Sequence, residues 1–101
     1  MREVLVLEDA ALDLEAGKDF YDASEFGVGS YFTNSLVVDI ESLVILHGIH
    51  SVHFGYHRML ASHFPFGIYY AEAPNQTRVV AVLDLRRDPS WLREEIASRR
   101  G

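Results

Sequence analysis

The fold is decided by two neighbouring stretches, HRMLASHFPFGIYY at residues 57–70 and VVAVLDLRRDP at residues 79–89. Three runs in this region are rich in β-branched, aromatic and aliphatic residues: 57–62, 66–72 and 78–86. Such residues are typical of strands, while the proline at 63–65 and the proline and asparagine at 73–77 favour turns. The sequence therefore predicts a three-stranded antiparallel meander on which the rest of the chain packs.

The residues before the meander predict a strand and then a helix. The apolar run at residues 4–7 is expected to form a first strand that is buried by pairing with the meander. Asp9 is the expected N-cap of the helix, because its carboxylate can accept a backbone N–H of the first turn. One face of the helix carries Ala10, Leu14, Gly17 and Tyr21, and the solvated side carries Asp13, Glu15, Asp19 and Asp22.

A second helix is expected between the Gly-Val-Gly sequence at 27–29 and Gly48, its expected C-cap. Ser30 is the expected N-cap of this helix. Its inner stripe consists of Phe32, Leu36, Ile40, Leu43 and His47, broadened by Val37 and Leu46. The two helices form an αα-hairpin whose apolar face needs a sheet to cover.

A loop at residues 49–56 leads into the meander, and a short helix at residues 89–99 follows it. Asp88 is the expected N-cap of that helix and Pro89 its first residue. The inner side of the helix carries Trp91, Leu92 and Ile96. The last four residues are expected to fray. We therefore predict a single α+β domain, residues 1–101, with a first strand, an αα-hairpin, the meander and a C-terminal helix.

Composition and charge exclude several classes of protein. The chain has 101 residues and no cysteine, which excludes disulfides, thiolate catalysis and cysteine-ligated zinc. No apolar run is long enough for a membrane span, and the N-terminus is too acidic for a signal peptide, so we expect a cytoplasmic protein. The net charge is −6. Residues 1–50 hold two basic and ten acidic residues, whereas residues 51–101 hold seven arginines and five acids. Such a chain is a poor general binder of nucleic acid.

The meander also resembles a known family. The pattern R-M-L…F-P-F-x-I-Y-Y, followed by V-V-A-V-L-D-x-R-R-D-P-x-W, is similar to the C-terminal half of the RelE/ParE superfamily of bacterial type II toxins. The resemblance implies the toxin of a toxin–antitoxin pair, similar to plasmid stabilisation proteins and neutralised by a cognate antitoxin. It implies no cofactor, and it implies DNA gyrase or the ribosome as the target.

Arg58, Arg86 and Arg87 are the candidates for binding an antitoxin or a target, because they fall on strands that can share a face or rim. Guanidinium groups suit phosphate and carboxylate. The alternative is that these arginines pair with Glu72, Asp84 and Asp88. Tyr69 and Tyr70 alternate along a strand, so one of them is expected on an exposed face. It could stack there on a nucleobase, although packing beneath a partner helix is the favoured interpretation.

The ribonuclease branch of the superfamily needs cations for the transition state and a group that moves the 2′-hydroxyl proton. Arg58 and Arg86 match basic positions of that pattern, and His57 is a weak candidate for the base. No lysine follows Lys18, however, and no tyrosine or histidine follows Tyr70. The ParE-like branch, which binds a protein such as gyrase, is therefore favoured. A RelE-like ribosome-dependent ribonuclease and a non-toxic cargo protein stay as alternatives, and a homodimer stays open.

Five histidines fall within 17 positions: His47, His50, His53, His57 and His63. They span a helix end, a loop and a strand, so no spacing forces their ring nitrogens to converge on an ion. We expect them to cap and line a polar loop, and the sequence predicts no metal site.

Overall fold

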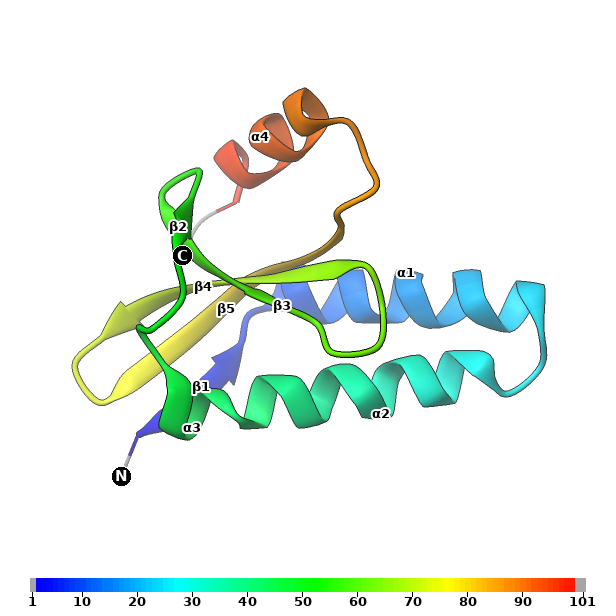
Figure 1. Cartoon of the computed structure of the whole chain (residues 1–101), viewed down its shortest axis with the longest axis horizontal. Coiled ribbons are helices and arrows are strands. Elements are labelled where there is room, and N and C mark those ends of the chain that lie inside the picture. The colour runs from blue at the N-terminus through cyan, green and yellow to red at the C-terminus, as the bar shows by residue number, and fades with distance from the viewer. Residues whose placement is uncertain (1, 100–101) are drawn as a thin grey trace.

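The computed structural model describes residues 2–99, which form a five-stranded mixed sheet with helices on both faces (Figure 1). The strand order is β1-β5-β4-β3-β2. The strands are β1 (Glu3–Val6), β2 (Val52–His53), β3 (Tyr56–Leu60), β4 (Phe66–Ala73) and β5 (Gln76–Asp84). The predicted meander is β3, β4 and β5, all antiparallel, while β1 pairs in parallel with β5. The predicted α+β class is confirmed.

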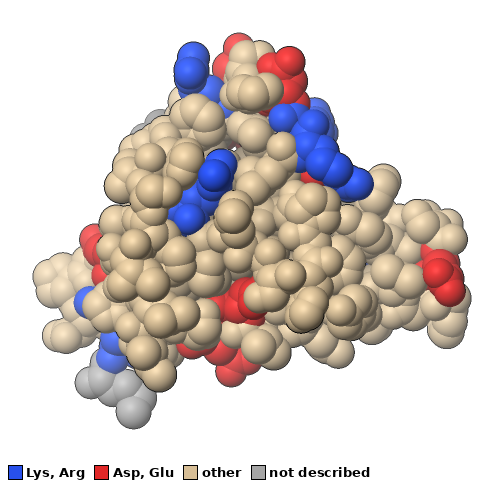
Figure 2. Space-filling view, viewed as in Figure 1, with Lys and Arg blue, Asp and Glu red and all other residues tan. Residues whose placement is uncertain are grey.

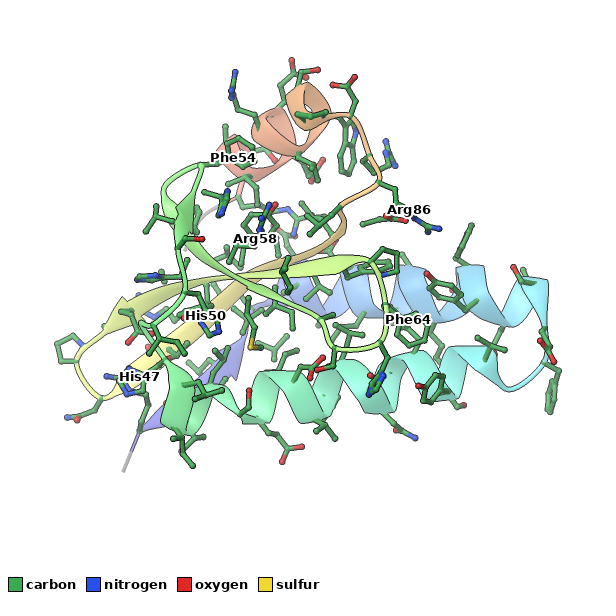
Figure 3. The ribbon with its side chains drawn as sticks, in the orientation of Figure 1. His47, His50, Phe54, Arg58, Phe64 and Arg86 are labelled. Carbon is green, nitrogen blue, oxygen red and sulfur yellow. The ribbon has the colours of Figure 1, made fainter. Side chains whose placement is uncertain are left out.

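The turns of the meander follow the predicted chemistry. Asn75 in the β4–β5 turn has a φ of 59°, in the left-handed region that asparagine tolerates. The β3–β4 connection is held by its backbone, because the Ala61 N–H donates to the Phe66 carbonyl at 2.9 Å. Its Phe64 ring points toward the helices (Figure 3) and packs 5.0 Å from the ring of Phe32.

Strand β2 is a correction to the predicted loop at residues 49–56. Its hairpin with β3 turns at Phe54 and Gly55, whose φ angles are 56° and 90°. Positive φ at both turn residues matches the twist of paired strands, and the turn usually contains asparagine or aspartate before glycine. A phenylalanine at the first position gives no such signal. Phe54 instead contributes to the apolar cluster beneath the C-terminal helix.

The helices α1 (Glu8–Ser24), α2 (Val28–Glu41) and α3 (Leu43–Leu46) cover one face of the sheet. The predicted inner faces are confirmed at Ala10, Gly17, Phe32, Leu36, Ile40 and Leu43, which are all buried. The prediction that Val37 and Leu46 broaden the inner stripe is wrong, because they are 40% and 39% exposed. Strand β1 is also more open than predicted: it lies at the sheet edge, and Leu5 and Val6 are exposed.

The predicted N-caps of the helix hairpin are wrong. Leu7 is the N-cap residue of α1, so Asp9 lies within the first turn. The cause is long-range pairing, because the Leu7 N–H donates to the Val79 carbonyl at 3.0 Å and the helix begins directly after it. Gly27, with a φ of 90°, precedes α2 in place of Ser30. The predicted ending is confirmed in outline, since α3 stops just before Gly48, which has a φ of 81°.

Helix α4 (Pro89–Ala97) covers the other face of the sheet. Its start is confirmed, because the Asp88 carboxylate accepts the Ser90 N–H at 2.8 Å and Pro89 occupies the first turn. Leu92 and Ile96 are buried and Trp91 is half-buried, as predicted. The expected fraying is wrong for Arg99, whose side chain is 8% exposed; residues 100–101 lie outside the described part of the chain.

Candidate functional site

Arg58 and Tyr69 share the sheet face that α4 covers. They are directly paired across β3 and β4, so their side chains stand side by side. Tyr69 is fully buried in one cluster with Leu92 and Ile96 of α4. The stem of Arg58 lies over Gly67, with Cδ 3.1 Å from the place of a Cβ there. Figure 3 shows the Arg58 side chain between the sheet and α4.

Two polar atoms of this pair lack hydrogen-bond partners. Arg58 Nε and Tyr69 Oη are both buried, and neither has a partner among residues 2–99. Leaving one buried donor unsatisfied costs about 1–3 kcal/mol, and a carboxylate or phosphate oxygen is the acceptor that suits a guanidinium. Tyr69 lies beneath the chain's own helix α4, so the predicted packing beneath a partner helix stays untested for it. The expectation of an exposed tyrosine is wrong, since Tyr70 is fully buried as well.

Arg86 is bound to the carboxylate of Asp84. Its Nε and Nη2 donate to the Asp84 oxygens at 2.6–3.2 Å, and its backbone N–H donates to Oδ1 at 2.9 Å. These hydrogen bonds hold the pKa of Asp84 below its ordinary value. The alternative that the candidate arginines pair with neighbouring acids therefore holds for Arg86, which pairs with Asp84.

Arg87 lies against Trp91 at the mouth of a cavity. Its guanidinium carbon is 3.7 Å from the centroid of the indole ring, a cation–π contact. The cavity, about 330 Å³, is bordered by α1, β5 and α4 and also lined by Phe20 and Val82. Figure 3 shows Arg58 and Arg86 pointing to different sides of the molecule. The candidate arginines thus do not form one cluster.

An ion pair that sequence reasoning missed anchors the chain's end. Arg99 donates to both oxygens of Asp13 at 2.8 and 2.9 Å, to the Val80 carbonyl at 3.1 Å and to Glu95 at 3.0 Å. Hydrogen bonding to Asp13 raises the pKa of Arg99. Asp13 also accepts the Val82 N–H at 2.9 Å, so its predicted place on the solvated side is wrong.

The opposite face of the sheet carries a histidine–tyrosine network. The Tyr70 hydroxyl accepts the Gly48 N–H at 3.0 Å and lies 2.5 Å from His50 Nδ1. His57 stacks on the Tyr70 ring with centroids 5.1 Å apart, and its Nδ1 donates to the His50 carbonyl at 2.7 Å. Burial and the nearby His57 lower the pKa of His50, and burial raises the pKa of Tyr70.

This network ties the segment after α3 to the sheet. Beside it, His47 Nδ1 and Arg2 Nη1 both contact one oxygen of Glu72, at 3.0 and 3.1 Å. Figure 3 shows His47 and His50 at this end of the molecule, away from Arg86. In the described part of the chain no three histidine or acidic side chains converge to hold a metal.

Adjacent positions on β3 separate two candidates for catalysis. His57 faces the helix hairpin and Arg58 faces α4, because successive side chains of a strand point to opposite faces. A base at His57 and a cation at Arg58 therefore cannot act on the same phosphate.

Charge is also divided between the two sides. Figure 2 shows most of the blue atoms on and below α4, which also carries red atoms, and mainly red atoms over α2. Among residues 2–99 no helix is long and apolar enough to cross a membrane.

Comparisons with known proteins bear on the fold. No family model matches the sequence, and no curated protein matches it. One solved structure with a similar fold is titled "Chromosomal ParDE TA system from P. aeruginosa". Its chain is 18% identical in sequence, superposes with a TM-score of 0.72, and the match covers 81% of this chain and 94% of that one. At this level of identity the match shows a shared fold, and the predicted order of strand, helix hairpin, meander and C-terminal helix is confirmed.

Proposed function

We propose that this chain is the toxin of a type II toxin–antitoxin pair, acting in the cytoplasm by binding a protein target such as DNA gyrase. The fold similarity to a chain of a ParDE system supports a toxin–antitoxin role. The observation that supports a binding mechanism is that the candidate catalytic side chains do not converge on one point. Arg86 is held by Asp84, and His57 lies on the face opposite Arg58.

Cleavage of mRNA makes greater chemical demands than binding a protein. The ribonuclease reaction needs several cations around the phosphate and a group that moves a proton. On the sheet face under α4 lie Arg58 and the fully buried Tyr69. Among the residues paired between β3 and β4, Arg58 is the one lysine or arginine. Arg58 is half-buried, and the part of its guanidinium that stays accessible suits a carboxylate side chain of a protein partner. We therefore propose Arg58 and Arg87 as contacts for an antitoxin or a target, and Arg86 as a support for the chain.

Induced expression tests this function, with and without the neighbouring open reading frame. We expect growth arrest that the neighbour's product relieves, with no new codon-dependent cuts in primer-extension maps of mRNA. Arg58→Ala should abolish the arrest while lowering the melting temperature only slightly, and the control Arg93→Ala, on the exposed side of α4, should leave the arrest intact. New cuts that vanish in Arg58→Ala would establish the ribonuclease instead. Full growth on induction of a folded protein would favour the non-toxic cargo protein.

A further inference from the structure

A groove on the helical side of the molecule has no role in the proposed function. It measures about 300 Å³ and lies between α2 and the β3–β4 connection. It is lined by Tyr31, Asn34, Ser35, Val38, Asp39, Ser62 and His63. We propose that this α2 groove receives a basic amphipathic segment of the antitoxin, with a lysine or arginine of that segment facing Asp39. The identity of the partner rests on the proposed function, whereas the chemistry of the segment rests on the groove.

One wall of the α2 groove is fixed before any partner arrives. Asp39 accepts the Ser62 N–H at 2.8 Å through Oδ2 and the Ser62 hydroxyl at 2.7 Å through Oδ1. Two residues further on, Phe64 is inserted among aromatic rings, 4.9 Å from Tyr21. The connection therefore cannot swing away without breaking both contacts. Such preorganisation reduces the conformational entropy that binding must remove.

The charge of the α2 groove calls for a cation. Asp39 makes no ion pair with any of residues 2–99. Each of its oxygens accepts one hydrogen bond from Ser62 and keeps a second acceptor site. The half of the chain that carries α2 holds ten acids and two basic residues. Tyr31, 54% exposed, adds an aromatic face at the same groove, on which a cationic side chain can lie.

The shape of the exposed surface suits an amphipathic segment. Tyr31, Val38 and Ile45 follow one another at seven-residue spacing, so they form one stripe along α2 and α3. Val38 is 65% exposed and Ile45 is 82% exposed. Beside this stripe, Ser35 is 9% exposed, and its hydroxyl has no hydrogen-bond partner among the described residues. A helix with apolar residues on one side and basic residues at its margin covers the stripe and neutralises Asp39.

Asn34 allows a test of the sign of the partner's charge. It is exposed and lines the groove, so Asn34→Lys and Asn34→Glu change the charge at one place while both keep a good helix former. The measurement is the Kd of the purified chain for the purified product of the neighbouring reading frame. We expect Asn34→Lys to weaken binding about tenfold, Asn34→Glu to bind at least as tightly as the wild type, and the difference to shrink at high salt.

Two further variants complete the test. Asp39→Asn, checked for an unchanged melting temperature, should weaken binding about tenfold. Ala11→Lys, at an exposed position of α1, should change the Kd less than about twofold. Equal Kd values for both Asn34 variants and the wild type would overturn the proposed groove. Tighter binding by Asn34→Lys would overturn the basic segment. If the wild-type chain binds no product of the neighbouring frame, the proposed function itself fails.

Discussion

Arg99→Ala is expected to lower the free energy of unfolding by about 3 kcal/mol and to loosen α4. Arg99 and Asp13 are largely shielded from solvent, with side-chain exposures of 8% and 15%. Removing one partner of a buried ion pair costs about 3–5 kcal/mol, because the other charge is left uncompensated. The lower end applies because Asp13 keeps its hydrogen bond from the Val82 N–H.

The protein supplies its own probe for this test. Trp91 is the single tryptophan of the chain and lies on α4, so its fluorescence reports the docking of that helix. Urea unfolding followed by fluorescence and by circular dichroism should show the loss of stability at an unchanged m-value. The control Arg93→Ala removes an exposed guanidinium, 5.6 Å from the ring centroid of Phe54. It should cost less than about 1 kcal/mol.

A double-variant cycle separates the ion pair from simple loss of side chain. Arg99→Ala and Asp13→Asn remove the same interaction, so the double variant should be destabilised by clearly less than the sum of the two single variants. Additive losses would show that the two residues act independently. A loss below about 0.5 kcal/mol for Arg99→Ala, the range of ordinary surface changes, would refute the anchoring role of this pair.

Three further outcomes follow from the structure. The folded state keeps the pKa of His50 below 6.5, so the unfolded state binds more protons. The unfolding free energy should therefore fall as pH drops below about 6.5. In His50→Gln, the unfolding free energy from urea titrations should depend less on pH over this range. Asp88→Ala should cost about 1 kcal/mol in thermal unfolding, because the Ser90 N–H loses its acceptor, and Asp88→Ser should restore most of it. Gly17→Ala places a Cβ 2.5 Å from Phe32 and should cost about 1–3 kcal/mol by calorimetry.

The parts of the fold that depend on local chemistry could be predicted from the sequence. The runs of β-branched residues and the turn at Asn75 define the meander, and the Asp88-Pro89 pair defines the start of α4. The start of α1 could not be predicted in this way. It depends on the pairing of Leu7 with Val79, two residues far apart in the chain. That backbone contact outweighs the capping preference of Asp9.

The sequence names candidate residues for a site, but it does not give their arrangement in space. Strand alternation correctly separates Tyr69 from Tyr70, yet both faces of the sheet are covered, so neither ring is exposed. The same alternation separates His57 from Arg58, and this decides against a shared catalytic role. Residues that are adjacent in sequence therefore lie on opposite faces of the sheet here.

The Asp13–Arg99 pair shows what periodicity leaves out. A helical wheel places Asp13 beside the apolar stripe of α1, at the margin between core and solvent, and composition then favours solvent. The margin of α1 becomes interior only because α4 returns over β5 and brings Arg99 to within 2.8 Å. The two residues are 86 positions apart, so no local pattern connects them. The charge of Asp13 is neutralised because the path of the chain brings Arg99 to it. This ion pair stabilises the position of α4 over Arg58 and Tyr69. Access to the proposed contact at Arg58 thus depends on an ion pair far from it in sequence.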